Sequence, residues 1–434
     1  MSTARAKALI AAAKEAAALD ARDSLASYRS EFAHPAPVNG NETVYLCGNS
    51  LGLMPIKAAQ RVKDTLSDWG EYAVRGHFEG EHPWMPYHHE ARHGLARLCG
   101  ALDDEVVAMN TLTLNLHLMM VSFYRPEGRR RKILIERDAF PSDRFAVRSQ
   151  IFWHGNNPDT DLIEWRERDS DGKLYLEDLE SLLDEHGAEI DLMLLPGVQY
   201  YSGQVLDIEA LSQLAKRHGI RLGLDLAHAI GNVELQLHDL EIDFAAFCTY
   251  KYLNSGPGAI GGVFVHQRHF ATDGQPRLLG WWGNNETTRF KMAPDYDRAP
   301  GANAWQLSNQ PILALAPLME SLELFSAAGM PALRKKSVTL TAFLERLLDQ
   351  HFSSALASIT PRNANERGCQ LSLVVNDPKV NARKLFKTLE AQNVIGDWRE
   401  PNVIRVAPTP LYNRFSDAVA LCQNLDAALA GSEA

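Results

Sequence analysis

The segment from Arg221 to His266 reads RLGLDLAHAIGNVELQLHDLEIDFAAFCTYKYLNSGPGAIGGVFVH and contains three short apolar runs. The runs are Leu222–Leu226, Ile242–Cys248 and Gly262–Val265. Each has the length and composition of a strand buried within an α/β sheet. Open α/β sheets bind their ligands at the carboxyl ends of their strands, so the residues that follow these runs are candidates for a functional site.

Ionisable side chains stand where two of these runs end. Asp225 lies near the end of the first run, His228 follows on the turn that leaves it, and Lys251 follows the second run directly after Tyr250. A charge at the end of a buried strand needs a partner, because an unpaired buried charge is costly or neutralises itself. We therefore expect Asp225 and Lys251 to hold one cofactor between them.

The cofactor that needs this pair is pyridoxal 5'-phosphate (PLP). A lysine amine forms a Schiff base with the PLP aldehyde, and a carboxylate keeps the pyridine nitrogen protonated so that the ring accepts electrons. A surface lysine or a helix-capping aspartate would each be ordinary on its own. The order Asp-x-x-His, apolar strand, Tyr-Lys and the Gly-rich segment 255–262 is much more specific.

The composition of the whole chain narrows the class of protein. With 434 residues, the chain is long enough for two lobes. Its formal net charge of −10 gives no support to nucleic-acid or anionic-membrane binding, and no apolar run approaches the length of a membrane-spanning helix. The five cysteines are scattered without a C-x-x-C pair, so we expect no disulfide framework, no metal site and a cytoplasmic location.

The segment Arg75–His93 is rich in histidine and aromatic residues. A metal site is one interpretation, but the spacing matches no zinc signature. We favour an aromatic wall beside a substrate.

Strands and helices alternate through the middle of the chain, which predicts a mostly parallel sheet flanked by helices. Strands are expected at Val106–Met109, Lys132–Glu136 and Asp191–Leu195, and a helix at Leu206–His218. An apolar helix over Leu114–Phe123 follows hydroxyl residues; its N-terminus could bind a phosphate, or these residues could only cap it. The segment Ala139–Asp143 is expected to be a loop at a strand end.

Three parts of the chain are predicted. Residues 1–40 form an N-terminal helical arm, residues 41–311 a large cofactor-binding domain, and residues 312–434 a connecting helix with a smaller C-terminal α+β domain. In this last part Arg405 lies within an apolar strand. A buried arginine needs a carboxylate, which either a structural acid or a substrate could supply.

Several longer motifs resemble the kynureninase family of fold-type I PLP enzymes. They are YLCGNSLGLMP (45–55), TLTLNLHLMM (111–120), AFPSD (139–143), GWWGNN (280–285), LSNQPIL (307–313) and IRVAPTPLYN (404–413), together with the segment quoted first. The resemblance implies PLP-dependent hydrolysis of L-kynurenine, or its 3-hydroxy derivative, to anthranilate or 3-hydroxyanthranilate and L-alanine. This reaction belongs to tryptophan catabolism and to NAD biosynthesis.

The resemblance also implies roles for individual residues. Lys251, Tyr250 and Asp225 are the implied catalytic residues, and the active site is expected to be shared across a homodimer. The implied cofactor contacts are Leu112, Thr113, Phe140, Pro141, Ser142, Asp143, Tyr201, Asp225, His228, Tyr250 and Lys251, with Trp281 and Asn309 reaching in from the second subunit. The implied substrate contacts are Arg405, Arg399, His77, Ser50, Ser308 and Asn309.

Two other functions are compatible with parts of this pattern. A cysteine desulfurase or aminotransferase could share this fold, but a desulfurase needs a reactive cysteine on a mobile loop, and Cys248 lies in an apolar strand. A regulatory or scaffold protein without activity is disfavoured by the complete set of Asp225, His228, Tyr250 and Lys251.

Overall fold

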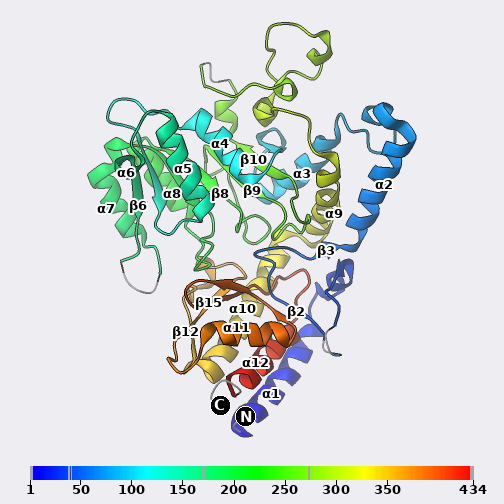
Figure 1. The fold of residues 1–434 in the computed structure, drawn as a ribbon, viewed down its shortest axis with the longest axis vertical. Helices are drawn as coiled ribbons and strands as arrows, with labels where there is room; N and C mark the ends of the chain where they lie inside the picture. Colours follow the sequence, from blue (N-terminus) through cyan, green and yellow to red (C-terminus); the bar gives the residue numbers. More distant parts are fainter. Residues whose placement is uncertain (1–2, 38–39, 41, 169–171, 272–273, 431–434) are drawn as a thin grey trace.

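The computed structural model describes residues 3–37, 40, 42–168, 172–271 and 274–430. Figure 1 shows a large lobe above a smaller one, and both chain ends lie in the smaller lobe. The interface between the lobes positions part of the candidate site.

The large lobe is built on a seven-stranded sheet in the order β4-β10-β9-β8-β7-β5-β6. The strands are β4 (Val106–Ala108), β5 (Lys132–Glu136), β6 (Leu162–Trp165), β7 (Ile190–Pro196), β8 (Arg221–Asp225), β9 (Phe244–Cys248) and β10 (Gly261–Val265). The pairings from β9 through β6 are parallel, and β10 runs antiparallel to both of its neighbours. The predicted mostly parallel sheet is therefore confirmed.

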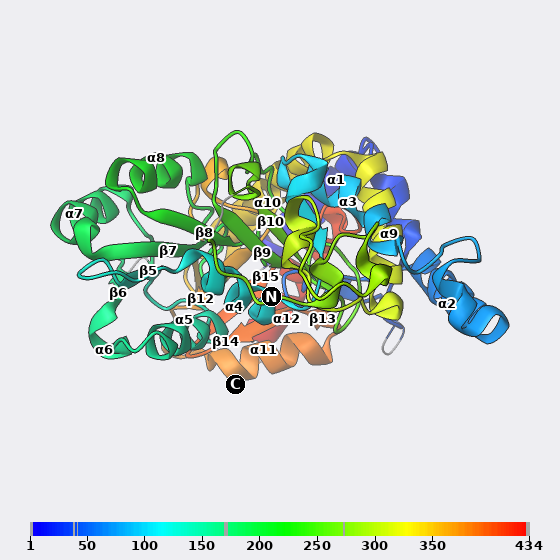
Figure 2. The ribbon, with the colours of Figure 1, turned by 90° about the horizontal axis from the view of Figure 1, so that it is seen from above.

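Helices cover both faces of this sheet because its strands are apolar on both sides. Phe244 and Ala246 belong to one hydrophobic core, while Ala245 and Phe247 belong to the other, as the alternation of side chains along a strand requires. One face carries α4 (Leu112–Phe123), α5 (Pro141–Trp153) and α6 (Pro158–Asp161), and the opposite face carries α7 (Leu176–His186) and α8 (Ile208–His218), as Figure 2 shows. The remaining large-lobe helices are α2 (Ile56–Tyr72) and α3 (Tyr87–Cys99), and α9 (Ile312–Ala328) packs against both.

The smaller lobe has an antiparallel sheet in the order β11-β12-β15-β14. Its strands are β11 (Leu356–Ser358), β12 (Leu371–Val375), β14 (Asp397–Arg399) and β15 (Val403–Val406), and its helices are α10 (Met330–Phe352), α11 (Ala382–Ala391) and α12 (Phe415–Ala430). This agrees with the predicted α+β arrangement of the C-terminal part.

The N-terminal segment joins this C-terminal lobe. Helix α1 (Thr3–Asp20) packs on α12, and its Leu9, Ala12 and Ala16 lie in the same hydrophobic core as Leu340 and Phe343 of α10. Farther along, β2 (Val44–Tyr45) pairs with β13 (Val394–Ile395), while β1 (Phe32–Ala33) pairs with β3 (Met54–Pro55). The domain boundaries at residues 40 and 311 stay predictions.

One segment is more helical than the sequence suggested. Ala139–Asp143 was expected to be a loop, but α5 begins at Pro141, whose fixed φ suits the first position of a helix. The His-rich segment Arg75–His93, for which the sequence predicted no conformation, contains the first part of α3. No single helix among the described residues is long and apolar enough to cross a membrane. Helices α9 and α10 meet the length and hydropathy conditions only as a pair, and that pair is bent by 80°.

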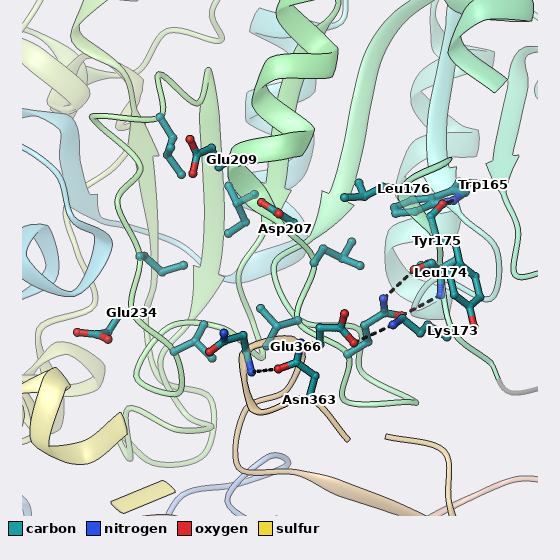
Figure 3. A pocket seen from close by; sticks show the side chains of 18 of the residues that line it. Trp165, Lys173, Leu174, Tyr175, Leu176, Asp207, Glu209, Glu234, Asn363 and Glu366 are labelled. Atoms are coloured by element: carbon teal, nitrogen blue, oxygen red, sulfur yellow. Dashed lines mark hydrogen bonds and ion pairs between the residues drawn. The ribbon is translucent and has the colours of Figure 1, made fainter. Parts of the chain in front are cut away.

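A cavity of about 500 Å³ lies where the lobes meet (Figure 3). Lys173 of the large lobe and Glu366 of the small lobe form an ion pair of 2.8 Å there. Its wall is mainly apolar with several acidic side chains, among them Asp207, Glu209 and Glu234, and it contains none of the predicted site residues. This cavity therefore lies between the lobes, which the ion pair connects at its wall, and it is separate from the site described next.

Candidate active site

The lysine predicted to bind the cofactor contacts a histidine predicted to lie near it. Lys251 follows β9, and its Nζ lies 2.9 Å from Nε2 of His228, which follows β8. Burial, and then the charge of Lys251, hold the pKa of His228 well below its usual value. His228 is therefore neutral and accepts a hydrogen bond from the Lys251 amine through Nε2.

Three carboxyl groups face the same cavity. Asp225 is buried at the end of β8, and Glu136 and Asp143 line the cavity beside it. Burial, and then the charge of Asp225, raise the pKa of Asp143, while burial is the main reason why the pKa of Glu136 is raised. Oδ1 of Asp143 and Nδ1 of His228 lack a hydrogen-bond partner. A ring carrying a protonated nitrogen fits such a surplus of buried acid, which is what PLP would bring.

The cavity has room for a flat ring beside an aromatic side chain. Its volume is about 170 Å³, and both Asp225 and Lys251 line it. Lys251 Nζ lies 5.9 Å from the centre of the Phe140 ring, which itself meets Tyr200 edge-on at 5.2 Å. Phe140 is thus in place to stack on a ring bound between Asp225 and Lys251.

One end of the cavity is suited to an anion. Leu112 and Thr113 form the first turn of α4, Ser142 lies in the first turn of α5, and the hydroxyl oxygens of Thr113 and Ser142 are 2.8 Å apart. Both helices direct free backbone N–H groups and the positive ends of their dipoles toward this point. Tyr250 lines the cavity too, and burial raises its pKa, so it keeps its proton. A phosphate would be held here by hydroxyls and helix N-termini.

A second, cationic group lies where the small lobe meets the large one. Arg405 of β15 is fully buried, and its Nη1 donates a hydrogen bond of 2.6 Å to the carbonyl oxygen of Tyr200, whose residue lines the cavity. Its Nη2 pairs with Asp397, which also forms a 2.8 Å ion pair with Arg399. Ser50 donates a hydrogen bond to the same Asp397 carboxylate. Two guanidinium groups and one carboxylate leave one net positive charge.

The remaining sequence-predicted residues lie outside the lining of this cavity. His77 contacts Val74 and Trp84, Tyr201 donates its hydroxyl to the carbonyl oxygen of Glu400, and Pro141 begins α5. Trp281, Ser308 and Asn309 are exposed on this chain. The structure thus gathers most of the residues predicted at the ring and the phosphate in one cavity, with the arginines predicted to bind the α-carboxylate beside it. The predicted contacts that lie outside are Pro141 and Tyr201 for the cofactor, Trp281 and Asn309 from a second subunit, and His77 and Ser308 for the substrate.

Sequence reasoning missed three residues that shape the site. Glu136 ends an apolar run, KILIE, and so gave the same signal that singled out Asp225. Tyr200 lines the cavity where Tyr201 was predicted, and no sequence pattern separates two adjacent tyrosines on a turn. Asp397 stood near Arg399 and Arg405 in the sequence, but its contact with both depends on the register of β14 and β15.

The His-rich segment brings His88 and His89 together with Glu286, with possible ligand atoms within 4.8 Å of one another. Burial is the main reason why the pKa of His88 is lowered, and Arg92 and Arg289 contribute less; their positive charges also oppose a metal cation. This cluster does not carry a metal assignment.

The fold is shared with solved structures of other proteins. A variant of the lyase C-DES with glycine covalently linked to its PLP cofactor has a TM-score of 0.74 at 19% identity, covering 88% of this chain and 96% of its own. A cysteine desulfurase from Thermococcus onnurineus NA1 has a TM-score of 0.71 at 18% identity, covering 92% and 100%. The fold and the site together define a fold-type I PLP-dependent enzyme.

Sequence comparisons identify the family. A kynureninase from Xanthomonas campestris pv. campestris (strain B100) is 52% identical over 95% of this chain and 96% of its own length, and one from Stenotrophomonas maltophilia (strain K279a) is 51% identical over 95% and 97%. The family model for the kynureninase C-terminal domain matches residues 333–425. The chain belongs to the kynureninase family, and it is a PLP-dependent hydrolase of that family.

Proposed function

We propose that this cavity hydrolyses L-kynurenine to anthranilate and L-alanine, with the 3-hydroxy derivative as an alternative substrate. The observation that carries the proposal is the contact between Lys251 and neutral His228 in a cavity that also receives Asp225. Buried Arg405 adjoins this cavity through Tyr200. Such a site can hold an amino acid by its carboxylate and present its α-carbon to a lysine.

Arg405 and Arg399 bind the substrate α-carboxylate in this proposal. Together with Asp397 they leave one net positive charge, which one carboxylate neutralises. Nε of Arg405 and Nε of Arg399 are buried donors without a hydrogen-bond partner, so an incoming carboxylate satisfies groups that are otherwise costly to bury.

The reaction depends on proton transfers by residues of this chain. When bound, PLP acts as an electron sink that weakens bonds at the α-carbon and β-carbon of an amino acid. The Lys251 amine takes the proton from the α-carbon, and neutral His228 accepts a hydrogen bond from that amine. Water adds to the γ-carbonyl carbon of kynurenine, and the bond between Cβ and Cγ breaks to release anthranilate. Tyr250, protonated and beside the anion-binding end, relays a proton to Cβ of the fragment that becomes alanine. Asp225 keeps the pyridine nitrogen protonated.

A second copy of the chain completes the aryl end of the proposed site. His77, Trp281, Ser308 and Asn309 lie outside the cavity within one chain. Trp281 is exposed by 46% and packs against the exposed Phe290, which in turn contacts Phe78 beside His77. Trp281, Phe290 and Phe78 form one exposed apolar surface, which a homodimer would bury.

The setting proposed for the enzyme is the cytoplasm, with a small molecule as its substrate. All five cysteines are free, as they are in a reducing compartment. The net charge of −10 disfavours nucleic-acid binding.

Replacing Lys251 with Ala tests the assignment. The variant is expected to lose at least about a thousandfold in turnover, because both the covalent anchor and the base are removed. The measurement is anthranilate fluorescence with kynurenine, and release of 3-hydroxyanthranilate with the hydroxylated substrate. Anthranilate release at the parent rate would refute the role of Lys251. Sulfide release from cysteine by the parent enzyme would favour a desulfurase, although Cys248 is buried with a pKa raised to about 11.

A further inference from the structure

The guanidinium of Arg405 has no free edge for a carboxylate in this structure. A carboxylate binds arginine in a bidentate manner through two N–H groups on one edge of the fork. The two such edges are formed by Nε with Nη2 and by Nη1 with Nη2, because Nη1 otherwise faces the side chain's own Cδ. Both edges therefore include Nη2.

Nη2 of Arg405 is fully engaged within the chain. It pairs with Oδ2 of Asp397 and lies 3.3 Å from Oγ of Ser50. The contact is built into the sheet, because Asp397 of β14 stands directly opposite Arg405 of β15 in the antiparallel register. Asp397 also holds Arg399 at 2.8 Å through Oδ1, so its carboxylate keeps a cationic partner if it leaves Arg405.

We propose that Asp397 is a specificity-determining residue that occupies the carboxylate-binding edge of Arg405 until an amino-acid substrate displaces it onto Arg399 and Ser50. This inference rests on the proposed role of Arg405. A simple anion must compete with Asp397 for Nη2 using only its own charge. Kynurenine competes with the additional binding energy of its amino group at the cofactor and of its aryl ring. Asp397 thereby excludes anions that carry no amino acid.

Anion inhibition of the cofactor-loaded enzyme tests the proposal. Asp397→Asn removes the competing charge at nearly constant volume, so acetate is expected to inhibit kynurenine hydrolysis at least about tenfold more tightly than in the parent enzyme. Asp397→Glu keeps the negative charge, so acetate is expected to inhibit this variant as weakly as it inhibits the parent enzyme. An unchanged inhibition constant for acetate in Asp397→Asn would overturn the proposal.

Asp417→Asn is the matched control. Asp417 is also a buried aspartate of the small lobe paired with two arginines, Arg29 and Arg414, but it lies outside the site. Its replacement is expected to lower stability without changing acetate inhibition. Equal tightening of acetate binding in both variants would show a general effect of lost negative charge and would refute the role given to Asp397.

Two further variants distinguish a failure of the role given to Asp397 from a failure of the proposed carboxylate site. If Asp397→Asn does not retain the cofactor absorption, Asp397→Ser is used with the same expectation, and failure of both to bind cofactor would make Asp397 a folding residue and overturn the proposal. Arg405→Lys tests the proposed function itself by its KM for kynurenine. A raised KM with unchanged acetate inhibition in the Asp397 variants would refute only the role of Asp397, whereas an unchanged KM would refute the carboxylate site.

Discussion

The acids around the cofactor cavity are buried, which makes their ionisation costly. Glu136 is buried, and burial raises its pKa well above the ordinary value, with a further contribution from the charge of Asp225. A pKa raised by folding means that the carboxyl stabilises the fold only while it is protonated. This contribution is complete below the pKa of the unfolded chain, about 4.3, and is lost as the pH rises through the higher folded value.

Replacing Glu136 with Gln is therefore expected to stabilise the cofactor-free protein at neutral and alkaline pH. The gain in melting temperature over the parent should grow as the pH rises above about 4.3, because the parent must then either take up a proton at Glu136 on folding or bury a charged carboxylate. Thermal unfolding across this range measures it. Glu105→Gln is the contrasting control: Glu105 is buried too, but its carboxylate accepts hydrogen bonds from the backbone N–H groups of Leu102 and Gln267, so this variant should be less stable. A pH-independent difference for Glu136→Gln would contradict the expectation.

How much of the site is readable from the sequence depends on the residue. Asp225, His228 and Lys251 could be predicted because ionisable side chains at the ends of apolar runs need partners, and the structure brings them to one cavity. Whether Tyr200 or Tyr201 lines the cavity could not be predicted, because the directions of adjacent side chains on a turn depend on the three-dimensional structure. The partner of Arg405 was open between a structural acid and a substrate, and the structure supplies Asp397.

At the scale of elements, the turn that carries Lys251 is set by a glycine from far earlier in the chain. The N–H of Gly52 donates to the carbonyl oxygen of Tyr250 at 2.9 Å. A Cβ at this position would overlap the carbonyl oxygen of Lys251 and the side chain of Asn254. The backbone of residues 48–52 thus packs directly beneath the lysine, which only a glycine permits.

Replacing Gly52 with Ala should displace this turn and lower kcat at least about tenfold, since small misplacements of a reacting group are expensive in rate. Gly70 in α2 provides the control, because a Cβ there meets nothing within 4 Å and alanine is the better helix former by about 1 kcal/mol. Gly70→Ala should keep its activity and gain stability. Steady-state kinetics and thermal unfolding of both variants decide the matter; full activity in Gly52→Ala would show that the turn can adjust.

Most helices and strands could be predicted from apolar runs in the sequence, and the missed start of α5 has a physical reason. The strand Lys132–Glu136 was predicted with its observed bounds, because a short apolar run is strongly constrained. The helix α5 was missed at its start, where Pro141 was interpreted as part of a loop although proline also favours the first helical turn. The same local residues suit a loop or the first turn of a helix, and packing against β5 and β6 selects the helix.

At the scale of the whole molecule, no part of the chain that the structure describes covers the surface that carries His77 and Trp281. Phe78, Phe290 and Met292 are exposed by 66%, 56% and 75%. Isolated apolar residues are normal on a surface, but a contiguous group of this kind is typical of an interface. A dimer would bury this group and bring the aryl-end residues to the cavity of the other subunit.

Mixing two inactive variants tests this arrangement. In a shared site, Lys251→Ala supplies an intact His77 surface and His77→Ala supplies an intact Lys251, so half of the sites in each mixed dimer are complete. Co-refolding or co-expression should restore about a quarter of the parent activity, because random pairing makes half of the dimers mixed. Each variant mixed with itself is the control. No recovery in mixtures shown to contain mixed dimers would place His77 and Lys251 in separate roles.

Helix α1 packs against α12, so an early segment of this sequence is covered by one that is synthesised much later. The apolar side of α1, with Leu9 and Ala12, has its lasting neighbours in a helix that finishes only at Ala430. At ribosomal speeds of ~5–20 residues per second, roughly 20–80 s separate the emergence of the two helices. During that interval the apolar side of α1 stays uncovered on the nascent chain, so this helix reaches its final packing only after α12 has been synthesised.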